Sequence, residues 1–487
     1  MNISTAAGLT KLRPPRFMSV GATDGHIVPE GIRRRLVRGL GANAFGNVVT
    51  IAIQLVTVPV LLQTWGTRVY GEWLVLVALA AFLAMSDWGF ENTAGNEMIA
   101  SLSVSDSDSA VEIFQSTSVL VALASAVFLV VSTGVALVFP FHEWFELRAL
   151  SVRQVVLTIL FLLLHVAVLL QAGVIRAAHR AAGDYAIGAM HGHVARIADA
   201  TAVVGTALLG GTPLQAAVAM LFSRATVTVF SGYQLRHRNS WVRFGFAHAR
   251  SVTIRRLLPG VTAMMAFPLG FALTLQGMVA AVGLVLGPVV VVAFATFRTL
   301  SRLAYQLGGV ITNAVWPEMS FAFGTGDVTM ARTLHRRTFQ VVMWLVAPAA
   351  LVIALGGRVL LHAWTGGSVP YMPTLLYLLL ATAVIEATWT ASAVVMLGSG
   401  RHHRIAGAYL AGAAVSVAMA IASMPRFGVE AAAASLLVVA VAMAPYVIRK
   451  SLALTGDSVS ELASVVLKPP SLPSLLGKRV APEGVQQ

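Results

Sequence analysis

Apolar stretches of about 20 residues or more recur along the whole chain, separated by short polar or basic segments. A helix that crosses the hydrocarbon core of a bilayer needs roughly 20 consecutive, mostly apolar residues. The turns at 210–213 and 425–428 are so short that each must join antiparallel neighbours. The pattern therefore predicts an all-α integral membrane protein of about twelve transmembrane helices, near residues 40–63, 70–90, 112–139, 154–176, 185–209, 213–233, 257–280, 286–312, 338–360, 372–397, 404–424 and 428–448.

Composition supports the same class of protein. Only 11% of the 487 residues are charged and 57% are hydrophobic, whereas soluble domains carry about 25% charged residues. The formal net charge of +14 is spread between the apolar stretches rather than gathered in one tract, so we expect no nucleic-acid partner. The chain has no cysteine, which excludes disulfides and thiolate metal sites.

The distribution of basic residues predicts the orientation. If the N-terminus is cytoplasmic, the external loops and their margins hold only five basic residues, Arg68, Arg148, Arg153, Arg358 and Arg426. The much larger remainder, which includes Arg176 and Arg180, then lies at the cytoplasmic side, as the positive-inside rule requires. The first apolar stretch continues past Leu62, which is typical of an uncleaved first helix rather than a signal peptide. Both termini are therefore expected in the cytoplasm.

A long basic connection divides the chain into two halves. We predict a basic cytoplasmic tail (1–39), an N-lobe (40–233), a basic linker (234–256), a C-lobe (257–448) and a flexible cytoplasmic tail (449–487). Three pairs of residues lie 221 positions apart at equivalent places in the halves: Glu97 and Glu318, Asp106 and Asp327, Arg180 and Arg401. Gly71 and Gly287 make a fourth pair, 216 apart. Six helices in each half predict two pseudo-symmetric lobes in the same orientation around a central cavity.

Two arginines lie well inside the eighth predicted helix. Charged side chains within a membrane are costly, on the order of 2.5–3.5 kcal/mol on the insertion scale, and they normally face a cavity or a partner. Arg298 and Arg302 share one helix face, with Tyr305 and Gln306 on neighbouring faces. Because the guanidinium fork pairs bidentately with phosphate oxygens, we interpret the four as a cationic wall for a pyrophosphate. The alternative is that both arginines reach toward the cytoplasmic headgroups.

Other intramembrane charges are candidates for ion coupling or ion pairing. Asp87 and Glu91 lie on one face at the inner end of the second helix, where they either hold a proton or cation or meet the interface. Arg196 and Asp199 are three residues apart on the fifth helix and are expected to neutralise each other.

Two further charges, Arg224 and Glu386, each stand alone in mid-helix, so each requires a partner from elsewhere in the fold. Arg224 is a further candidate for the substrate cavity, and Glu386 is a further candidate for ion coupling or ion pairing. His191 and His193 point in different directions on a helix and have no third ligand nearby, so we expect no metal site. No phosphate-cradling Gly-Lys-Ser/Thr loop is present, which argues against direct use of ATP. We predict neither a cofactor nor a catalytic residue.

Several motifs resemble those of bacterial polysaccharide-biosynthesis membrane proteins, the flippases of O-antigen-type lipid-linked oligosaccharides. Pro59 near the end of the first helix is followed by Gly66, the pair Tyr70-Gly71 and Trp73, and Asp87-Trp88-Gly89-Phe90 lies at the end of the second helix. Trp316-Pro317-Glu318 and Gly326-Asp327 follow the eighth helix. This resemblance covers roughly residues 40–450 and extends to the superfamily that also contains the multidrug and toxic-compound extruders.

The resemblance implies a flippase of the bacterial inner membrane. It would move a polyprenyl-pyrophosphate-linked oligosaccharide between leaflets by alternating access, with membrane lipid, a polysaccharide polymerase and glycosyltransferases as partners. The sequence leaves two alternatives open. A cation-coupled multidrug extruder would have an acid-lined cavity for cationic substrates; the acidic residues of the second and tenth helices support this alternative and the arginines oppose it. A membrane polysaccharide polymerase or ligase would need a larger external loop than 140–153 or 361–371.

Overall fold

The computed structural model describes residues 30–84, 87–401, 403–466 and 468–470, which form helices without a single strand among them. Nine helices of this described part are long and apolar enough to cross a membrane. The prediction of an all-α membrane protein is confirmed, and the number of twelve spans stays a prediction.

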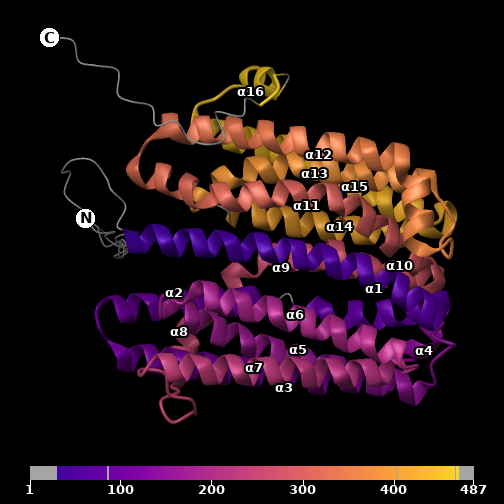
Figure 1. Cartoon of the computed structure of the whole chain (residues 1–487), viewed down its shortest axis with the longest axis horizontal. Helices are drawn as coiled ribbons and strands as arrows, with labels where there is room; N and C mark the ends of the chain where they lie inside the picture. The colour runs from indigo at the N-terminus through magenta and orange to yellow at the C-terminus, as the bar shows by residue number, and fades with distance from the viewer. Residues whose placement is uncertain (1–29, 85–86, 402, 467, 471–487) are drawn as a thin grey trace, which may run out of the picture.

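The helices form two lobes (Figure 1). The N-lobe contains α2 (Asp87–Ser103), α3 (Ser107–Val138), the short α4 (Phe141–Trp144), α5 (Val152–Ala181), α6 (Tyr185–Leu208) and α7 (Pro213–Arg238). The C-lobe contains α11 (Pro288–Thr325), α12 (Val328–Thr365), α13 (Pro373–Gly398), α14 (His403–Phe427) and α15 (Glu430–Thr455). The long α1 (Glu30–Ala84) lies between them and packs against both α6 and α11. This arrangement confirms the predicted two-lobed architecture.

Backbone geometry supports the internal repeat and corrects one of its pairs. Gly66 interrupts α1 with φ 71° and ψ 170°, and Gly287, 221 positions later, precedes α11 with φ 81° and ψ 168°. Asp106 and Asp327 cap α3 and α12 in the same way, each accepting a hydrogen bond from a backbone N–H three residues on. The predicted pairing of Gly71 with Gly287 was wrong, because the positive-φ glycine equivalent to Gly287 is Gly66.

The seventh predicted helix, residues 257–280, is broken. It comprises α8 (Ser251–Met264), α9 (Ala266–Ala272), the π-helical turn η1 (Leu273–Gly277) and α10 (Met278–Leu286). The first piece, α8, packs against α2 and α3, so it lies on the N-lobe, whereas α9, η1 and α10 pack against α14 of the C-lobe. The connection between α7 and α8 spans only 239–250, shorter than the predicted linker. This broken path joins the two lobes.

The lobes meet closely at the end where α1 turns at Gly66. The backbone of Gly71 approaches Pro288 so nearly that a Cβ on Gly71 would lie 2.1 Å from the Pro288 carbonyl oxygen. A Cβ on Gly283 would likewise lie 2.8 Å from Cγ2 of Val75. The part of α1 after Gly66 is attached to the N-lobe, because Glu72 accepts hydrogen bonds from the backbone N–H groups of Ala149 and Leu150. Its tight packing against Gly283 and Pro288 therefore closes the two lobes against each other at this end. By the predicted orientation, it is the external end.

The chain beyond α15 is more ordered than the predicted flexible tail. The helix α15 continues to Thr455, and the short α16 (Val459–Val466) lies outside α12 (Figure 1). Arg336 of α12 forms ion pairs with Asp457 and Glu461, and the Trp344 indole N–H donates to the carbonyl oxygen of Val466 at 2.8 Å. Hydrogen bonds that the Arg336 guanidinium donates to the Asp457 carboxylate lower its pKa from 3.8 to about 2. The last part of the predicted tail, 471–487, lies outside the described residues.

Candidate functional site

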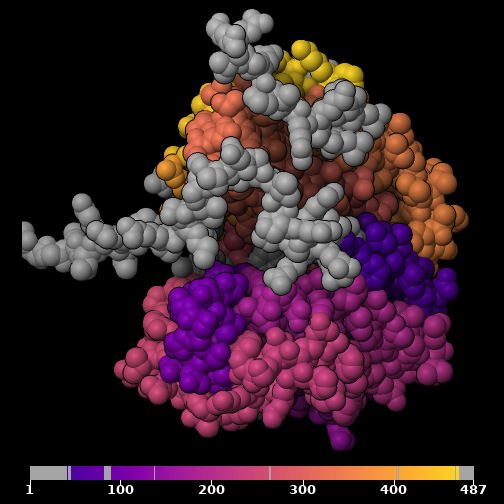
Figure 2. Space-filling view, turned by 60° about the vertical axis from the view of Figure 1, so that its left-hand side comes forward, coloured from indigo at the N-terminus to yellow at the C-terminus, as the bar shows by residue number. Residues whose placement is uncertain are grey.

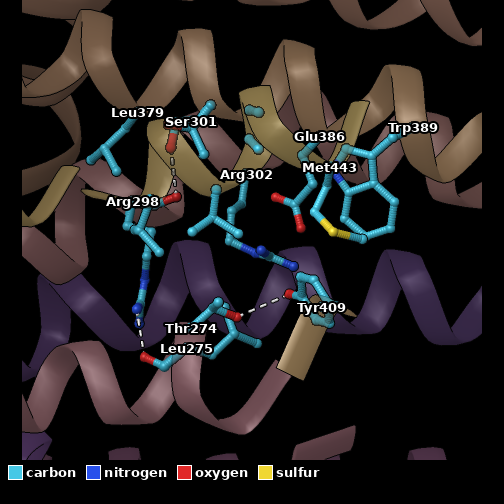
Figure 3. Close-up of a pocket in the computed structure, with 15 residues that line it drawn as sticks. Thr274, Leu275, Arg298, Ser301, Arg302, Leu379, Glu386, Trp389, Tyr409 and Met443 are labelled. Carbon is cyan, nitrogen blue, oxygen red and sulfur yellow. Dashed lines mark hydrogen bonds between the residues drawn. The ribbon is translucent and has the colours of Figure 1, made fainter. Parts of the chain in front are cut away.

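One polar cavity lies within the C-lobe, among η1, α11, α13, α14 and α15 (Figure 3). Arg298 enters it from α11 and donates to the carbonyl oxygen of Leu275 at 2.6 Å. Leu275 lies in the π-helical turn, where i→i+5 pairing replaces the regular ladder and leaves carbonyl groups available to side chains. Arg298 therefore has a structural contact that holds η1 against α11.

The second arginine of this cavity lies near an acid. The guanidinium of Arg302 is 5.1 Å from the ring centroid of Tyr305, and Figure 3 shows it between the Glu386 carboxylate and the hydrogen-bonded pair of Thr274 and Tyr409. The cavity holds about 50 Å³, which admits a few water molecules but no sugar. The predicted grouping of Arg298, Arg302 and Tyr305 is present. The structure places it inside one lobe, not between the two.

A larger cleft lies between the lobes, away from the closed end. Its volume is about 570 Å³, within the ~300–1,000 Å³ range typical of small-molecule sites. The space-filling view in Figure 2 looks toward the end opposite the closed one, with N-lobe helices below and C-lobe helices above. Helices α2, α5, α6 and α7 supply most of the wall and α11 supplies Trp316. Four arginines line this cleft: Arg176, Arg180, Arg196 and Arg224.

Arg180 is bound to the start of α2 by neutral groups. Its guanidinium donates to Oδ1 of Asn92 at 3.0 Å and to the backbone oxygens of Glu91 and Asn92 at 3.3 and 3.2 Å. Gly95 makes room for it, because a Cβ there would lie 2.1 Å from Nη2 of Arg180. The charge of Arg180 has no carboxylate partner in the described part of the chain.

Among the described residues Arg196 also has no acidic partner, which corrects the predicted pair with Asp199. Its guanidinium contacts the Thr50 hydroxyl at 3.1 Å and Nδ1 of His193 at 2.5 Å. Asp199 instead forms a buried ion pair with Arg224 of α7 and accepts a hydrogen bond from His165 at 3.0 Å. The reason is geometric: the Asp199 side chain turns toward α5 and α7, while Arg196 faces α1.

The cleft as a whole is cationic. Glu91 pairs with Arg176 at 2.8 Å, and Asp199 pairs with Arg224. Counted over the described residues, four arginines minus these two carboxylates leave a net charge of +2, which belongs to Arg180 and Arg196. In a partly apolar cleft two unpaired guanidinium groups favour a ligand that carries two negative charges.

The sequence identified only part of this cleft. It named Glu91, Arg196 and Arg224, but interpreted Arg176 and Arg180 as orientation signals and gave Trp316 no role at the site. Gln306 lies elsewhere and donates to Oε1 of Gln54 on α1 at 3.1 Å. The side chain of Asp87 lies outside the described residues. Among those described, no group of His, Asp or Glu has the arrangement of a metal site.

No protein-family model and no curated protein matches the sequence. A multidrug resistance MATE family transporter of the MOP superfamily, in its inward-facing conformation, is similar with a TM-score of 0.70 and 13% identity, over 84% of this chain and 96% of that one. The fold is that of a MATE transporter.

Two further structures share this fold. An outward-facing conformation of a multidrug resistance MATE family transporter has a TM-score of 0.63 and 13% identity, over 89% of this chain and 97% of that one. A MOP superfamily transporter from Pyrococcus furiosus has a TM-score of 0.52 and 14% identity, over 86% and 94%. Its description states that a reverse polarity of the binding pocket suggests a different function. The MATE fold is known in both inward- and outward-facing conformations.

Proposed function

We propose that this protein moves a polyprenyl-diphosphate-linked oligosaccharide from the cytoplasmic to the external leaflet of a bacterial inner membrane. The observation that carries the proposal is the unpaired charge of Arg180 and Arg196 in the inter-lobe cleft. A diphosphate esterified at both ends carries about two negative charges near neutral pH, one on each phosphate. The charge of the substrate therefore matches that of the cleft.

The same charge argues against a cationic drug as the main substrate. A cation in this cleft would meet two guanidinium groups that have no carboxylate partner among the described residues, and Glu91 and Asp199 are already paired with Arg176 and Arg224. Pocket polarity is also the feature that sets the Pyrococcus furiosus transporter apart, by its description. A multidrug extruder is compatible with the fold, so it remains the alternative that the experiment must separate.

In the proposed mechanism the cleft opens toward the cytoplasm while the lobes are closed at Gly71 and Pro288. The diphosphate binds Arg180 and Arg196, the sugars occupy the cleft, and the prenyl chain stays in lipid. Rocking of the lobes then closes the cleft and separates the Gly71–Pro288 contact. Glycosyltransferases supply the loaded lipid on the cytoplasmic side, and a polymerase or ligase receives it outside.

The test replaces both unpaired arginines, as Arg180→Gln and Arg196→Gln, in cells that make a surface polysaccharide. Each lost charge-assisted contact is worth about 2 kcal/mol, or roughly 30-fold in affinity. We expect the lipid-linked glycan to accumulate on the inner leaflet and the surface polysaccharide to be lost. Arg255→Gln is the matched control, because Arg255 is exposed and lines neither cavity.

Normal surface polysaccharide in the double variant, at normal protein levels, would refute the proposal. Efflux of a cationic dye by the wild-type chain, unchanged in that variant, would favour the extruder. Replacing Arg298 and Arg302 by Met serves as a separate arm. Because these arginines line only the small C-lobe cavity, we expect that variant to lose stability without losing diphosphate affinity.

A further inference from the structure

The cleft has an aromatic side chain on each wall. Trp316 of α11 is the residue through which the C-lobe lines it, and its side chain is 44% exposed. Tyr185, the first residue of α6, lines the opposite wall and is 45% exposed. The two aromatic groups therefore belong to different lobes, and the arginines all belong to the N-lobe.

Trp316 is poorly explained as a packing residue. Its indole forms no ring contact, and its N–H donates no hydrogen bond to any residue that the structure describes. By contrast, Trp344 and Trp364 each donate their indole N–H to a backbone oxygen, at 2.8 and 2.9 Å. An exposed indole face with a free donor is suited to a pyranose ring, whose C–H groups stack on the aromatic face while a hydroxyl accepts from the N–H.

We propose that the cleft distinguishes a glycosylated polyprenyl diphosphate from the bare polyprenyl diphosphate, by binding the diphosphate on the N-lobe and stacking the first sugar on Trp316 of the C-lobe. This inference rests on the proposed function. The first sugar is bonded directly to the diphosphate, so a ligand held by Arg180 and Arg196 presents that sugar inside the same cleft. A volume of about 570 Å³ admits both parts.

The division between the lobes has a consequence for transport. A ligand shifts a conformational equilibrium only by its difference in affinity for the two states. The bare carrier contacts the N-lobe alone, so it does not favour approach of the two walls. The glycosylated carrier contacts both walls and stabilises the closed cleft. The closed cleft, which transport requires, is therefore stabilised by the glycosylated lipid and not by the bare carrier.

The experiment measures binding to the full-length chain in lipid nanodiscs. The two probes are a polyprenyl diphosphate bearing one hexose and, as the bare probe, the same diphosphate capped by a methyl ester, which has no sugar but keeps the charge of about −2. We expect the wild-type chain to bind the glycosylated probe about tenfold more tightly, the range of one aromatic stacking contact. Trp316→Ala should abolish this preference and leave the affinity for the bare probe unchanged, while Trp316→Phe should retain most of it.

Phe321→Ala is the matched control, because Phe321 is an exposed aromatic residue of the same helix that does not line the cleft. Equal weakening of both probes by Trp316→Ala, or survival of the preference, would overturn the inference. The Arg180→Gln, Arg196→Gln variant should weaken both probes. If it weakens neither, the proposed function fails. If it weakens the binding of both probes while Trp316→Ala changes neither, the proposed function stands and only the stacking of the first sugar on Trp316 is refuted.

Discussion

The buried network around Asp199 offers a sharp test of the fold. Asp199 is 8% exposed and Arg224 4% exposed, and the two form an ion pair. Asp199 also accepts hydrogen bonds from His165 and from the Ser223 hydroxyl, both at 3.0 Å. Asp199→Asn keeps the volume and removes the charge, which leaves the Arg224 guanidinium buried without a counter-ion.

Removing one partner of a buried ion pair costs about 3–5 kcal/mol, whereas replacing both partners is often nearly neutral. Because asparagine still accepts a hydrogen bond, we expect Asp199→Asn to cost about 3 kcal/mol, the lower end of that range. The double variant with Arg224→Met should regain most of this loss, so the coupling energy should be about 2–3 kcal/mol. The assay is reversible unfolding in mixed micelles at rising mole fractions of SDS.

A second cycle makes the reasoning refutable. Asp199→Asn combined with Arg196→Gln tests the pair that the i, i+3 spacing favours, and the structure predicts a coupling below about 1 kcal/mol for it. A coupling energy with Arg196 larger than that with Arg224 would show that Asp199 pairs with Arg196 of its own helix and not with Arg224 of α7. Additivity in both cycles would show that neither arginine is coupled to Asp199 and would refute the buried ion pair.

Two further predictions concern the closed end and the C-terminal helix. Gly71→Val places side-chain atoms against the Pro288 carbonyl, so spin labels on cysteines introduced on either side should report a wider separation of the lobes. Gly134→Val, with nothing within 4 Å, should not change it, and an unchanged separation in the first variant would contradict the closed contact. Asp457→Asn should speed amide exchange of α16 at neutral pH. In the wild type, the pKa of about 2, lowered from 3.8 by Arg336, means that this ion pair is complete above about pH 4 and is lost as the pH falls toward 2. Equal protection factors of the α16 amides at pH 7 and pH 2, corrected for the pH dependence of intrinsic exchange, would exclude it.

The sequence predicted those features that depend on local chemistry. Bilayer thickness sets the length of an apolar helix, so the helical class and the lobes followed from hydropathy. The pairing of Asp106 with Asp327 was predicted correctly because only a few residue types, aspartate among them, are favoured at a helix N-cap, so the same residue recurs at the same place in both halves. The sequence did not identify the partner of Gly287, because composition does not reveal which glycine has a positive φ. Gly71 lies 216 positions from Gly287 rather than 221 and lacks the positive φ that Gly66 and Gly287 share.

Contacts between helices could not be predicted from the sequence. Arg196 and Asp199 satisfy the spacing rule for an ion pair, yet Arg224 reaches Asp199 from the neighbouring helix, and no pattern along one helix predicts that. Arg176 and Arg180 show a deeper limit. An arginine near the cytoplasmic end of a helix fulfils the positive-inside rule whether it faces lipid headgroups or a cleft. The orientation signal therefore concealed the binding signal. What separates the two roles is tertiary: Gly95 leaves the space that Arg180 fills, and no carboxylate approaches it among the described residues. A cationic cleft at the cytoplasmic end needs no residues beyond those that already orient the chain.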